Sequence, residues 1–536
     1  MKDQYDYIIV GAGSAGCVVA NRLSEDPKRQ VLLIESGPSD NNSLIKMPRG
    51  VGLILNEGSK YIWDYQAHTT PDRPSERWFK GRAIGGSSSV NGMVYVRGAP
   101  LDYNNWQAMG CEGWGWDQIG PKFKALEDHD QGSAEYRGVG GPLKVSTHPG
   151  GDPLCEAIID AAQELGVNRV NDVNDVDAVR DGGIGYQAST TWQGKRFSAA
   201  SAFLKPVLKR SNLTVLNETD VLKIEFTDKR ATSLSIRNKK GIQRVSAKTE
   251  IILCAGAIET PKLLQLSGVG PAELLSSHGI EVIVDSPDVG QNLREHRHFD
   301  VQYKVVSHSH NYLLSGWRAI RSALQYFLIG KGPMTHAAHE LGGFVKSTPD
   351  LDHADTQFGL MMLSASGSPA TGEVTLNTFP GITFLGYFTR PTSQGEIKIQ
   401  SADFDVAPYI NARHLDTEED QRKAVAVIRW LRKLAEQPAL KDWIVEETVP
   451  GPAVQSDEDI LAKAIDIGGT CFHICGTARM GIDDKAVVNP RLQVNGVSGL
   501  RVVDTSIMPT LVSGNTNAPA MVIGMRAADF ILEDNK

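Results

Sequence analysis

The amino-acid sequence predicts a Rossmann-like α/β domain that is interleaved with an α+β domain. A strand, a glycine-rich loop and a helix open the chain within residues 5–23. A second strand–helix unit of the same character follows at residues 250–266. From about Ser307 to Gln455, strand and helix patterns mix without regular alternation. Because the chain has 536 residues, more than one hydrophobic core usually supports, we expect two domains.

The first unit has the order that a dinucleotide-binding fold requires. Tyr5–Val10 and Val31–Ile34 are short apolar runs, typical of buried parallel strands. Between them, the loop Gly11–Gly16 leads directly into a predicted helix, Cys17–Leu23.

Each glycine of this loop has a physical role in such a fold. Gly11 permits the tight turn, Gly13 lets the backbone approach a pyrophosphate, and Gly16 lets helix and strand pack closely. The pyrophosphate would then lie on the free N–H groups of the helix N-terminus. Glu35 ends the second strand, where a carboxylate accepts hydrogen bonds from the adenosine ribose and disfavours NADP. This pattern alone leaves FAD and NAD as alternatives.

Residues 38–77 show no clear periodicity and are expected to be irregular. They lead into a second glycine- and serine-rich cluster, Gly81–Met93. The apolar Ile84 and Val90 bracket its centre, which favours a buried loop over a surface turn.

The Rossmann-like domain is expected to resume after an excursion. Leu213–Leu216, Val221–Phe226 and Glu250–Cys254 are predicted strands, and the last is a fully apolar run. A helix follows, for which Thr260 is the expected cap and Pro261 the first-turn residue.

Interleaving predicts five segments. Residues 1–155, 205–300 and 465–536 form the cofactor-binding domain, and residues 156–204 and 301–464 the substrate-binding domain. The second domain contains predicted helices at Trp317–Leu328 and Glu418–Gln437 and a strand at Glu396–Gln400.

Composition excludes several classes of protein. A net charge of -8 and a pI of about 5.9 argue against nucleic acid as a partner. Six cysteines are too few for a disulfide scaffold, so we expect a cytoplasmic protein. Met1–Gln4 runs straight into a strand, leaving no room for a signal peptide, and no apolar run approaches the ~18 residues of a transmembrane helix. Peripheral membrane attachment stays open.

Histidine pairs with metal-site spacing occur twice, as His296 and His298 and as His308 and His310. Neither pair has the cysteines or carboxylates that would complete a ligand shell. We therefore expect no metal.

His473 is the most conspicuous of the thirteen histidines. It lies between Cys471 and Cys475, which offer zinc ligation or a redox disulfide as alternatives, but no second ligand pair follows. Downstream, Leu500–Asp504 is a predicted strand, and the polar segment Gly514–Pro519 leads into a predicted helix, Ala520–Leu532. The positive end of that helix dipole would stabilise an anionic ring. These residues alone leave a structural and a functional role for His473 equally open.

Taken together, these segments resemble the glucose-methanol-choline (GMC) oxidoreductases, in particular choline dehydrogenase-like and alcohol dehydrogenase-like flavoproteins, over essentially the whole chain. The resemblance is carried by Gly81–Met93, Gly256–Gly270, Val289–His296, Pro391–Gly395 and Asp504–Asp529. It implies FAD rather than NAD.

The resemblance also implies roles for individual residues. FAD would be bound by Gly11, Gly13, Ser14, Ala15, Gly16, Glu35, Arg82, Gly86, Ser87, Asn91, Gly92, Met93, Val221, Asp504, Asn515 and Thr516. His473 matches the family's catalytic histidine and Asn515 the second residue of its catalytic pair. Val90 stands where some members carry the histidine that binds FAD covalently, which implies non-covalent FAD. Ile474 replaces the proline that usually follows the catalytic histidine.

The expected reaction is oxidation of a primary alcohol, or of an exposed secondary one, to an aldehyde or ketone. His473 would take the hydroxyl proton while a hydride passes to flavin N5, and Asn515 would donate a hydrogen bond to the developing alkoxide. The expected partners are a small-molecule alcohol and an electron acceptor, either a quinone or dye-type compound or O2. Alternatives are a hydroxynitrile-type lyase, an NAD-dependent dehydrogenase and a purely binding flavoprotein.

Five further residues are candidates for an apolar substrate pocket, although at helix spacing such residues are more often core. They are Trp317, Tyr326, Phe327, Met361 and Met362.

Overall fold

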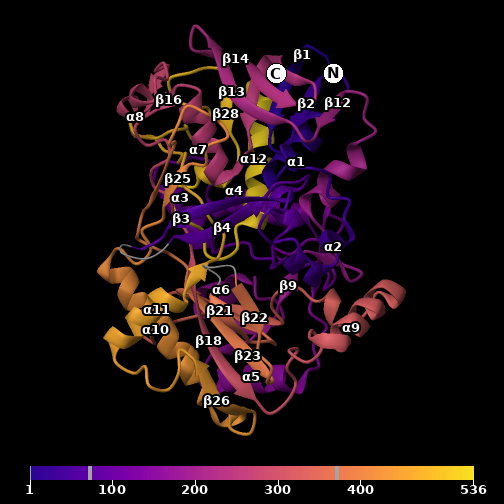
Figure 1. Cartoon of the computed structure of the whole chain (residues 1–536), viewed down its shortest axis with the longest axis vertical. Coiled ribbons are helices and arrows are strands. Elements are labelled where there is room, and N and C mark those ends of the chain that lie inside the picture. Colours follow the sequence, from indigo (N-terminus) through magenta and orange to yellow (C-terminus); the bar gives the residue numbers. More distant parts are fainter. Residues whose placement is uncertain (1, 71–74, 369–372, 536) are drawn as a thin grey trace.

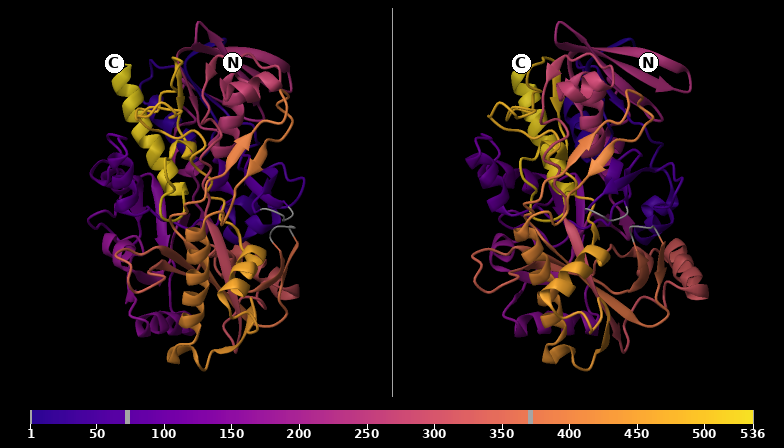
Figure 2. Two further views of the ribbon diagram at one scale, coloured as in Figure 1. Left: turned by 90° about the vertical axis from the view of Figure 1, so that its left-hand side faces the viewer. Right: turned by 60° about the vertical axis from the view of Figure 1, so that its left-hand side comes forward.

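The computed structural model describes residues 2–70, 75–368 and 373–535. The chain forms two bodies along the long axis of the molecule, each built around one large sheet (Figure 1). Both ends of the chain belong to the same body, and the C-terminal helix lies beside segments from the beginning of the chain (Figure 2).

The first sheet contains the predicted Rossmann-like unit. Its order is β12-β2-β1-β15-β14-β13, with β28 paired to β15. These strands are β1 (Gln4–Val10), β2 (Val31–Ile34), β12 (Leu213–Leu216), β13 (Asp220–Thr227), β14 (Arg230–Asn238), β15 (Gly241–Leu253) and β28 (Leu500–Val502). Five of these strands form a parallel set, in which β12 pairs with β2, β2 with β1, β1 with β15 and β15 with β28. Segments from the beginning, middle and end of the chain therefore share one sheet, as the interleaved organisation predicts.

Two helices pack against each other on this sheet. α1 (Ser14–Leu23) follows β1 directly, and α12 (Asn517–Asp534) begins three residues before the predicted start. Gly524 of α12 makes this packing close, because a Cβ there would lie 2.8 Å from the carbonyl oxygen of Ala15.

The second sheet belongs to the substrate-binding body. Its order is β26-β18-β23-β20-β19-β8-β7, with β27 paired to β18. The strands are β7 (Asn168–Arg169), β8 (Gly183–Tyr186), β18 (Arg297–Val305), β19 (Leu341–Val345), β20 (Thr356–Met361), β23 (Gly381–Phe388), β26 (Ile444–Val449) and β27 (Gly469–Thr470). The helices α5 (Pro153–Glu164) and α10 (Glu418–Ala435) pack on it and on each other. The predicted α/β and α+β combination is confirmed, whereas the five segment boundaries stay a prediction.

Residues 38–70 and 75–77 are not all irregular, so this prediction was wrong for the described part of the segment. They contain the strand β3 (Ile62–His68), which pairs with β4 (Glu76–Gly81). β3 also pairs with β25 (Tyr409–Asn411), which in turn pairs with β24 (Glu396–Lys398), in a small four-stranded sheet. β3 buries only alternate side chains, so it lacks the continuous apolar run of the central strands.

The expected cap at Thr260 was also wrong. The helix α7 (Gly256–Leu266) begins one turn earlier, after Ala255. The Thr260 hydroxyl instead donates a hydrogen bond to Asp504 Oδ2 at 2.7 Å, a partner far along the chain.

The predicted helix at Trp317–Leu328 is α9 (Gly316–Ile329). Only Ser322 and Tyr326 of α9 are buried, so Trp317 and Phe327 lie on the surface and not in a pocket. Within the described ranges, no helix has the length and apolar character needed to cross a bilayer.

Candidate active site

A cavity of about 890 Å³ lies between the two bodies. One end is formed by the ends of β1 and β2, including Gly11 and Glu35, and the other by β18 and β23, including Gln302 and Tyr387. His473 also lies on the wall of this cavity. The volume falls in the range of small-molecule and cofactor sites, roughly 300–1,000 Å³.

The two glycine-rich loops abut at the first end of this cavity. Gly11 has a φ of 100°, and a Cβ there would lie 2.4 Å from the carbonyl oxygen of Cys254. A Cβ on Gly16 would lie 1.9 Å from the Gly11 oxygen, so helix and strand need this glycine to pack. A Cβ on Gly86 would lie 2.7 Å from Gly13 Cα, so the second loop presses directly on the first. A Cβ on Gly13 would meet only the carbonyl oxygen of Cys254, at 3.9 Å, so the protein leaves free space beside this cavity-lining glycine. This is the clearance that a pyrophosphate requires.

The Glu35 carboxylate is held by two backbone N–H groups, one in the loop after β1 and one just after Glu35 itself. Its two carboxylate oxygens accept hydrogen bonds from the N–H groups of Ala12 at 2.9 Å and Gly37 at 2.8 Å. Burial raises the pKa of Glu35 to about 7. Each oxygen keeps a further lone pair for a ribose hydroxyl at the cavity wall.

The N-terminus of α12 also faces the cavity. Thr516 precedes the helix without a side-chain cap, so the first-turn N–H groups face the cavity with their partial positive charge. Ser14 Oγ donates to Asn517 Oδ1 at 2.7 Å and thereby ties the first glycine loop to this helix.

Most of the predicted cofactor residues meet in this cavity. Those lining it are Gly11, Gly13, Ser14, Ala15, Glu35, Gly86, Ser87, Asn91, Gly92, Met93, Val221, Asp504, Asn515 and Thr516. Gly16 and Arg82 do not line it. The Arg82 guanidinium instead bonds to Ser36 and Asp220 and lies over the Trp63 ring at 4.4 Å. Arg82 therefore supports the strand ends from outside the cavity.

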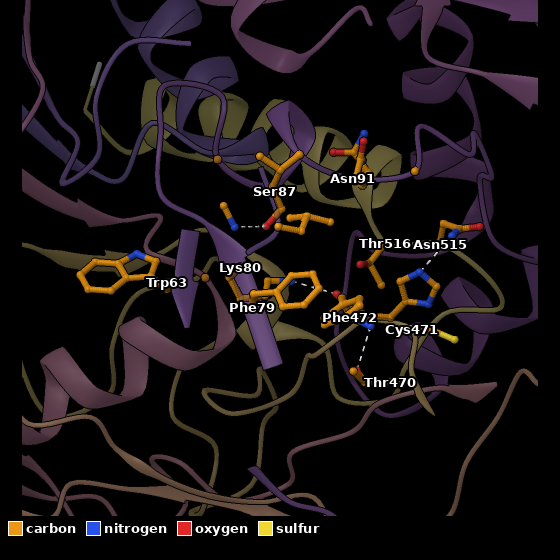
Figure 3. Close-up of a pocket in the computed structure, with 18 of the residues that line it drawn as sticks. Trp63, Phe79, Lys80, Ser87, Asn91, Thr470, Cys471, Phe472, Asn515 and Thr516 are labelled. Atoms are coloured by element: carbon orange, nitrogen blue, oxygen red, sulfur yellow. Dashed lines mark hydrogen bonds between the residues drawn. The ribbon is translucent and has the colours of Figure 1, made fainter. Parts of the chain in front are cut away.

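His473 and Asn515 are in direct contact; Figure 3 labels Asn515 and marks this hydrogen bond by the dashed line to the imidazole. Asn515 Nδ2 lies 2.9 Å from His473 Nε2. Gln357 Nε2 donates to Asn515 Oδ1 at 3.1 Å, and the Tyr387 hydroxyl donates to Gln357 Oε1 at 2.6 Å. The chain of donors fixes the Asn515 amide with its N–H toward His473, so His473 Nε2 accepts.

His296 contacts the other nitrogen of the same ring. Its Nε2 lies 2.8 Å from the carbonyl oxygen of Thr389 and its Nδ1 lies 2.9 Å from His473 Nδ1. A carbonyl only accepts, so His296 Nε2 carries the proton and His296 Nδ1 accepts. His473 Nδ1 must then donate, which again leaves His473 Nε2 unprotonated. The two ends of the network give the same tautomer.

Both imidazoles are neutral near pH 7. Burial, together with the neighbouring His296 and Lys80, holds the pKa of His473 well below 6.5. Burial lowers the pKa of His296 to about 3. His473 is therefore poised as a base whose free nitrogen lies beside Asn515 at the cavity wall.

The backbone around His473 is constrained on both sides. Phe472 has a φ of 61°, a left-handed conformation that costs free energy in a non-glycine residue. Its oxygen accepts from Lys80 Nζ at 2.9 Å, and its ring stacks on Phe79 at 4.5 Å. The His473 N–H donates to Glu295 Oε1 at 2.8 Å. These contacts hold the imidazole in place.

The sequence placed His296 in a pair with metal-site spacing and in the segment Val289–His296, but it did not predict the contact with His473. Its presumed partner His298 instead contacts Asp300, with 2.9 Å between Nδ1 and Oδ1. The second pair also separates, because His308 contacts Asp152. All six cysteines are free thiols.

One group among the described residues has metal-site geometry, namely His310, His336 and Glu340. The Arg49 guanidinium already donates to Glu340 Oε1 at 2.5 Å and to His310 Nδ1 at 2.9 Å. Glu340 therefore has a cationic partner without a metal.

The candidate pocket residues divide into three classes. Met361 lines the cavity, Met362 and Tyr326 are buried away from it, and Trp317 and Phe327 are exposed.

Comparison with known proteins gives a consistent result. The family model of the GMC oxidoreductases matches residues 5–298 with its N-terminal part and residues 391–524 with its C-terminal part. An alcohol dehydrogenase (acceptor) of Pseudomonas putida is 39% identical, over 98% of this chain and 96% of its own. An oxygen-dependent choline dehydrogenase of Sinorhizobium fredii is 36% identical, over 99% of this chain and 96% of its own. A solved structure of Aspergillus oryzae formate oxidase, studied for its FAD modification, is similar with a TM-score of 0.91 at 26% identity, covering 100% of this chain and 99% of that one.

Proposed function

The chain belongs to the GMC oxidoreductase family and is an FAD-dependent alcohol oxidoreductase, and we propose that His473 is the base that removes the substrate's hydroxyl proton. The observation that carries this proposal is the buried, neutral imidazole whose unprotonated Nε2 lies 2.9 Å from Asn515 at the cavity wall.

An alcohol hydroxyl barely ionises at neutral pH, so loss of a hydride from the adjacent carbon needs a base. Bound FAD supplies the acceptor for that hydride at flavin N5. His473 Nε2 takes the hydroxyl proton as the C–H bond breaks, a contribution of roughly 10²–10⁴-fold for a positioned base. Asn515 Nδ2 turns from His473 to the substrate oxygen and stabilises its developing negative charge.

His296 acts through His473 and is a positioning residue. Its Nδ1 accepts the His473 Nδ1–H and so keeps the lone pair on the nitrogen that faces the cavity. When His473 Nε2 gains a proton, this contact also lowers the energy of the imidazolium, because the Nδ1–H then donates more strongly.

FAD is held without a covalent bond. The cofactor residues named above fit it, since Gly13 leaves open space and the N-terminus of α12 favours negative charge. Val90, which lines the cavity where some members carry a linking histidine, has no nucleophilic atom. After denaturation and precipitation, the flavin is expected in the supernatant; flavin that stays with the polypeptide would contradict this.

The substrate is a small primary alcohol, and the electron acceptor is a quinone or dye-type compound, with O2 as the alternative. Support for an apolar substrate comes from Met361, Leu363 and Leu385 on the cavity wall. Support for a separate acceptor comes from the similar Pseudomonas putida enzyme, named for one. A cytoplasmic location stays a prediction from the sparse cysteines.

The experiment is anaerobic stopped-flow mixing of the FAD-loaded protein with a panel of primary and secondary alcohols. We expect primary alcohols to bleach the flavin absorbance near 450 nm, as is general for flavin reduction. Reoxidation is then followed with a soluble quinone and with aerated buffer, and the faster of the two identifies the acceptor class. A flavin that no alcohol bleaches would contradict alcohol oxidation.

A further inference from the structure

The helix α9 exposes several large apolar side chains to solvent, most of them on one side of the helix. Figures 1 and 2 show α9 standing out from the substrate-binding body. Six large apolar side chains of this helix are between 54% and 79% exposed. They are Trp317, Ile320, Leu324, Phe327, Leu328 and Ile329. Exposed apolar residues normally occur singly, so a group of six on one short helix indicates a binding surface.

The positions around the helix separate a face that packs on the protein from an apolar outer face. Successive residues turn by about 100°. Ser322 and Tyr326 therefore share the face that packs on the protein, and both are buried. Ile320, Leu324 and Phe327, together with Trp317 and Leu328, form a stripe about 100° wide on the outer side. The stripe is as wide as one that normally faces a core, yet it faces solvent.

Basic residues flank this stripe. Arg318 and Arg321 are exposed beside it, and exposed Lys331 follows the helix. Between Asp300 and Glu340 the sequence has no acidic residue, although the whole chain has a net charge of -8. The positive charge is therefore local to this segment, and it complements an anionic surface.

We propose that α9 docks this protein on an anionic lipid bilayer by lying in the membrane interface. With 14 residues it is about 21 Å long, too short to cross a hydrocarbon core of about 30 Å. A projecting, convex helix with apolar side chains next to arginines suits a fluid interface, into which the stripe sinks while the guanidinium groups reach lipid phosphates. A second protein would need a groove shaped to this convex helix.

Docking at α9 places the cavity close to the lipid phase. α9 packs against the short 3-10 helix η5 (Pro333–Thr335), and the residues just after η5, Ala338 and His339, form part of the cavity wall. Apolar alcohols and quinones partition into lipid, so both would reach the protein from this side. The docking itself does not depend on the proposed reaction.

The test is flotation of the FAD-loaded protein with vesicles of phosphatidylcholine alone or with phosphatidylglycerol. We expect binding to vesicles that contain phosphatidylglycerol. The triple variant Ile320→Glu/Leu324→Glu/Leu328→Glu should bind at least about tenfold more weakly, because three side chains no longer bury apolar area. The control Ile242→Glu, at a similarly exposed position in the hairpin between β14 and β15, should bind like the wild type.

A second variant isolates the charge contribution. Arg318→Gln/Arg321→Gln leaves the apolar stripe intact and should weaken binding on the order of tenfold, with a smaller effect of added salt. All variants should keep their FAD content and their reduction by a water-soluble alcohol, which shows that they are folded.

Three results would overturn the proposal. One is a wild-type protein that stays unbound with both kinds of vesicle. Another is a triple variant that floats as well as the wild type. The third is self-association of the wild type without lipid that the triple variant abolishes, which would make α9 an interface between two copies of this chain.

Discussion

Two clusters of histidines in this molecule have similar side chains but differ in their charged groups. Among the described residues, the ring nitrogens of one contact no carboxylate, and the other contains an arginine–glutamate pair. At the active site, His296 and His473 contact each other, and neither ring nitrogen touches a carboxylate. Burial, with a smaller contribution from Arg390, lowers the pKa of His296 to about 3. In the cluster of Arg49, His310, His336 and Glu340, the guanidinium of Arg49 holds the pKa of the buried Glu340 at about 2.

The two clusters differ in their charged groups and not in the charge of their imidazoles. Burial lowers the pKa of His336 to about 4, so this histidine beside Glu340 is neutral near pH 7, like His296 and His473. In the second cluster the charges are paired, with Arg49 donating to Glu340, so loss of Arg49 would leave the buried carboxylate without its cationic partner. The following changes test this contrast, from the largest expected effect to the smallest.

Replacing His473 removes the base. We expect His473→Ala to keep its FAD and to lower the rate of flavin reduction by at least ~100-fold. The measurement is anaerobic stopped-flow absorbance with a saturating alcohol. The matched change His336→Ala in the second cluster should leave that rate nearly unchanged. Near-normal reduction by His473→Ala would remove His473 from the proposed role.

Removing Arg49 leaves a buried charge without its partner. Glu340 is only 2% exposed, so Arg49→Met should lower the free energy of unfolding by about 3–5 kcal/mol at pH 7. The measurement is urea unfolding followed by circular dichroism. Arg49→Lys keeps the positive charge, so its free energy of unfolding should fall by less than that of Arg49→Met.

The pH dependence of this loss has a definite sign. Glu340 has a folded pKa of about 2 against an ordinary 4.5, so its pairing stabilises the protein above pH 4.5 and is lost as pH falls toward 2. The difference in the free energy of unfolding between the wild type and Arg49→Met should therefore become smaller below pH 4.5. A difference that stays constant down to pH 3 would contradict the assignment.

Changing His296 tests the orientation of the catalytic ring. His296→Leu removes the acceptor for the His473 Nδ1–H, and kcat should fall about 10–100-fold with little change in KM, since the contact that orients the His473 ring is lost. His296→Gln retains one acceptor and one donor and should recover part of the rate. A purely structural role would make both variants lose FAD or stability without this split between kcat and KM.

Adding an anion should give the active site the property of the second cluster. Because the pKa of His473 lies well below 6.5, kcat/KM should stay level as pH falls through 6.5 and decline only at lower pH. Gln357→Glu places a carboxylate beside Asn515 and should raise the pKa of His473, moving the acid limb up by about one pH unit. The control Gln357→Met should not move it. If the acid limb of the kcat/KM profile stays where it is in Gln357→Glu, this limb does not arise from the protonation of His473.

Local sequence order was enough to predict the first half of the cofactor site. β1, the Gly11–Gly16 loop, α1 and β2 follow one another directly, so each element constrains the next. The same holds for the buried Gly81–Met93 loop. By contrast, β3 was missed because it exposes Asp64, Gln66 and His68 and pairs with β25 from a distant part of the chain. Thr260 was misassigned because its partner Asp504 is distant in sequence.

The sequence by itself determined the dinucleotide fold and the family and singled out His473 as the candidate base, since glycine loops and strand periods are properties of neighbouring residues. Only the tertiary structure decided that His296 sets the tautomer of His473, that Arg82 stands outside the cavity, and that α9 exposes its apolar side. Protonation, pairing and exposure depend on groups that the fold brings together from distant segments. Their burial and distances, not their order along the chain, fix the free energies involved.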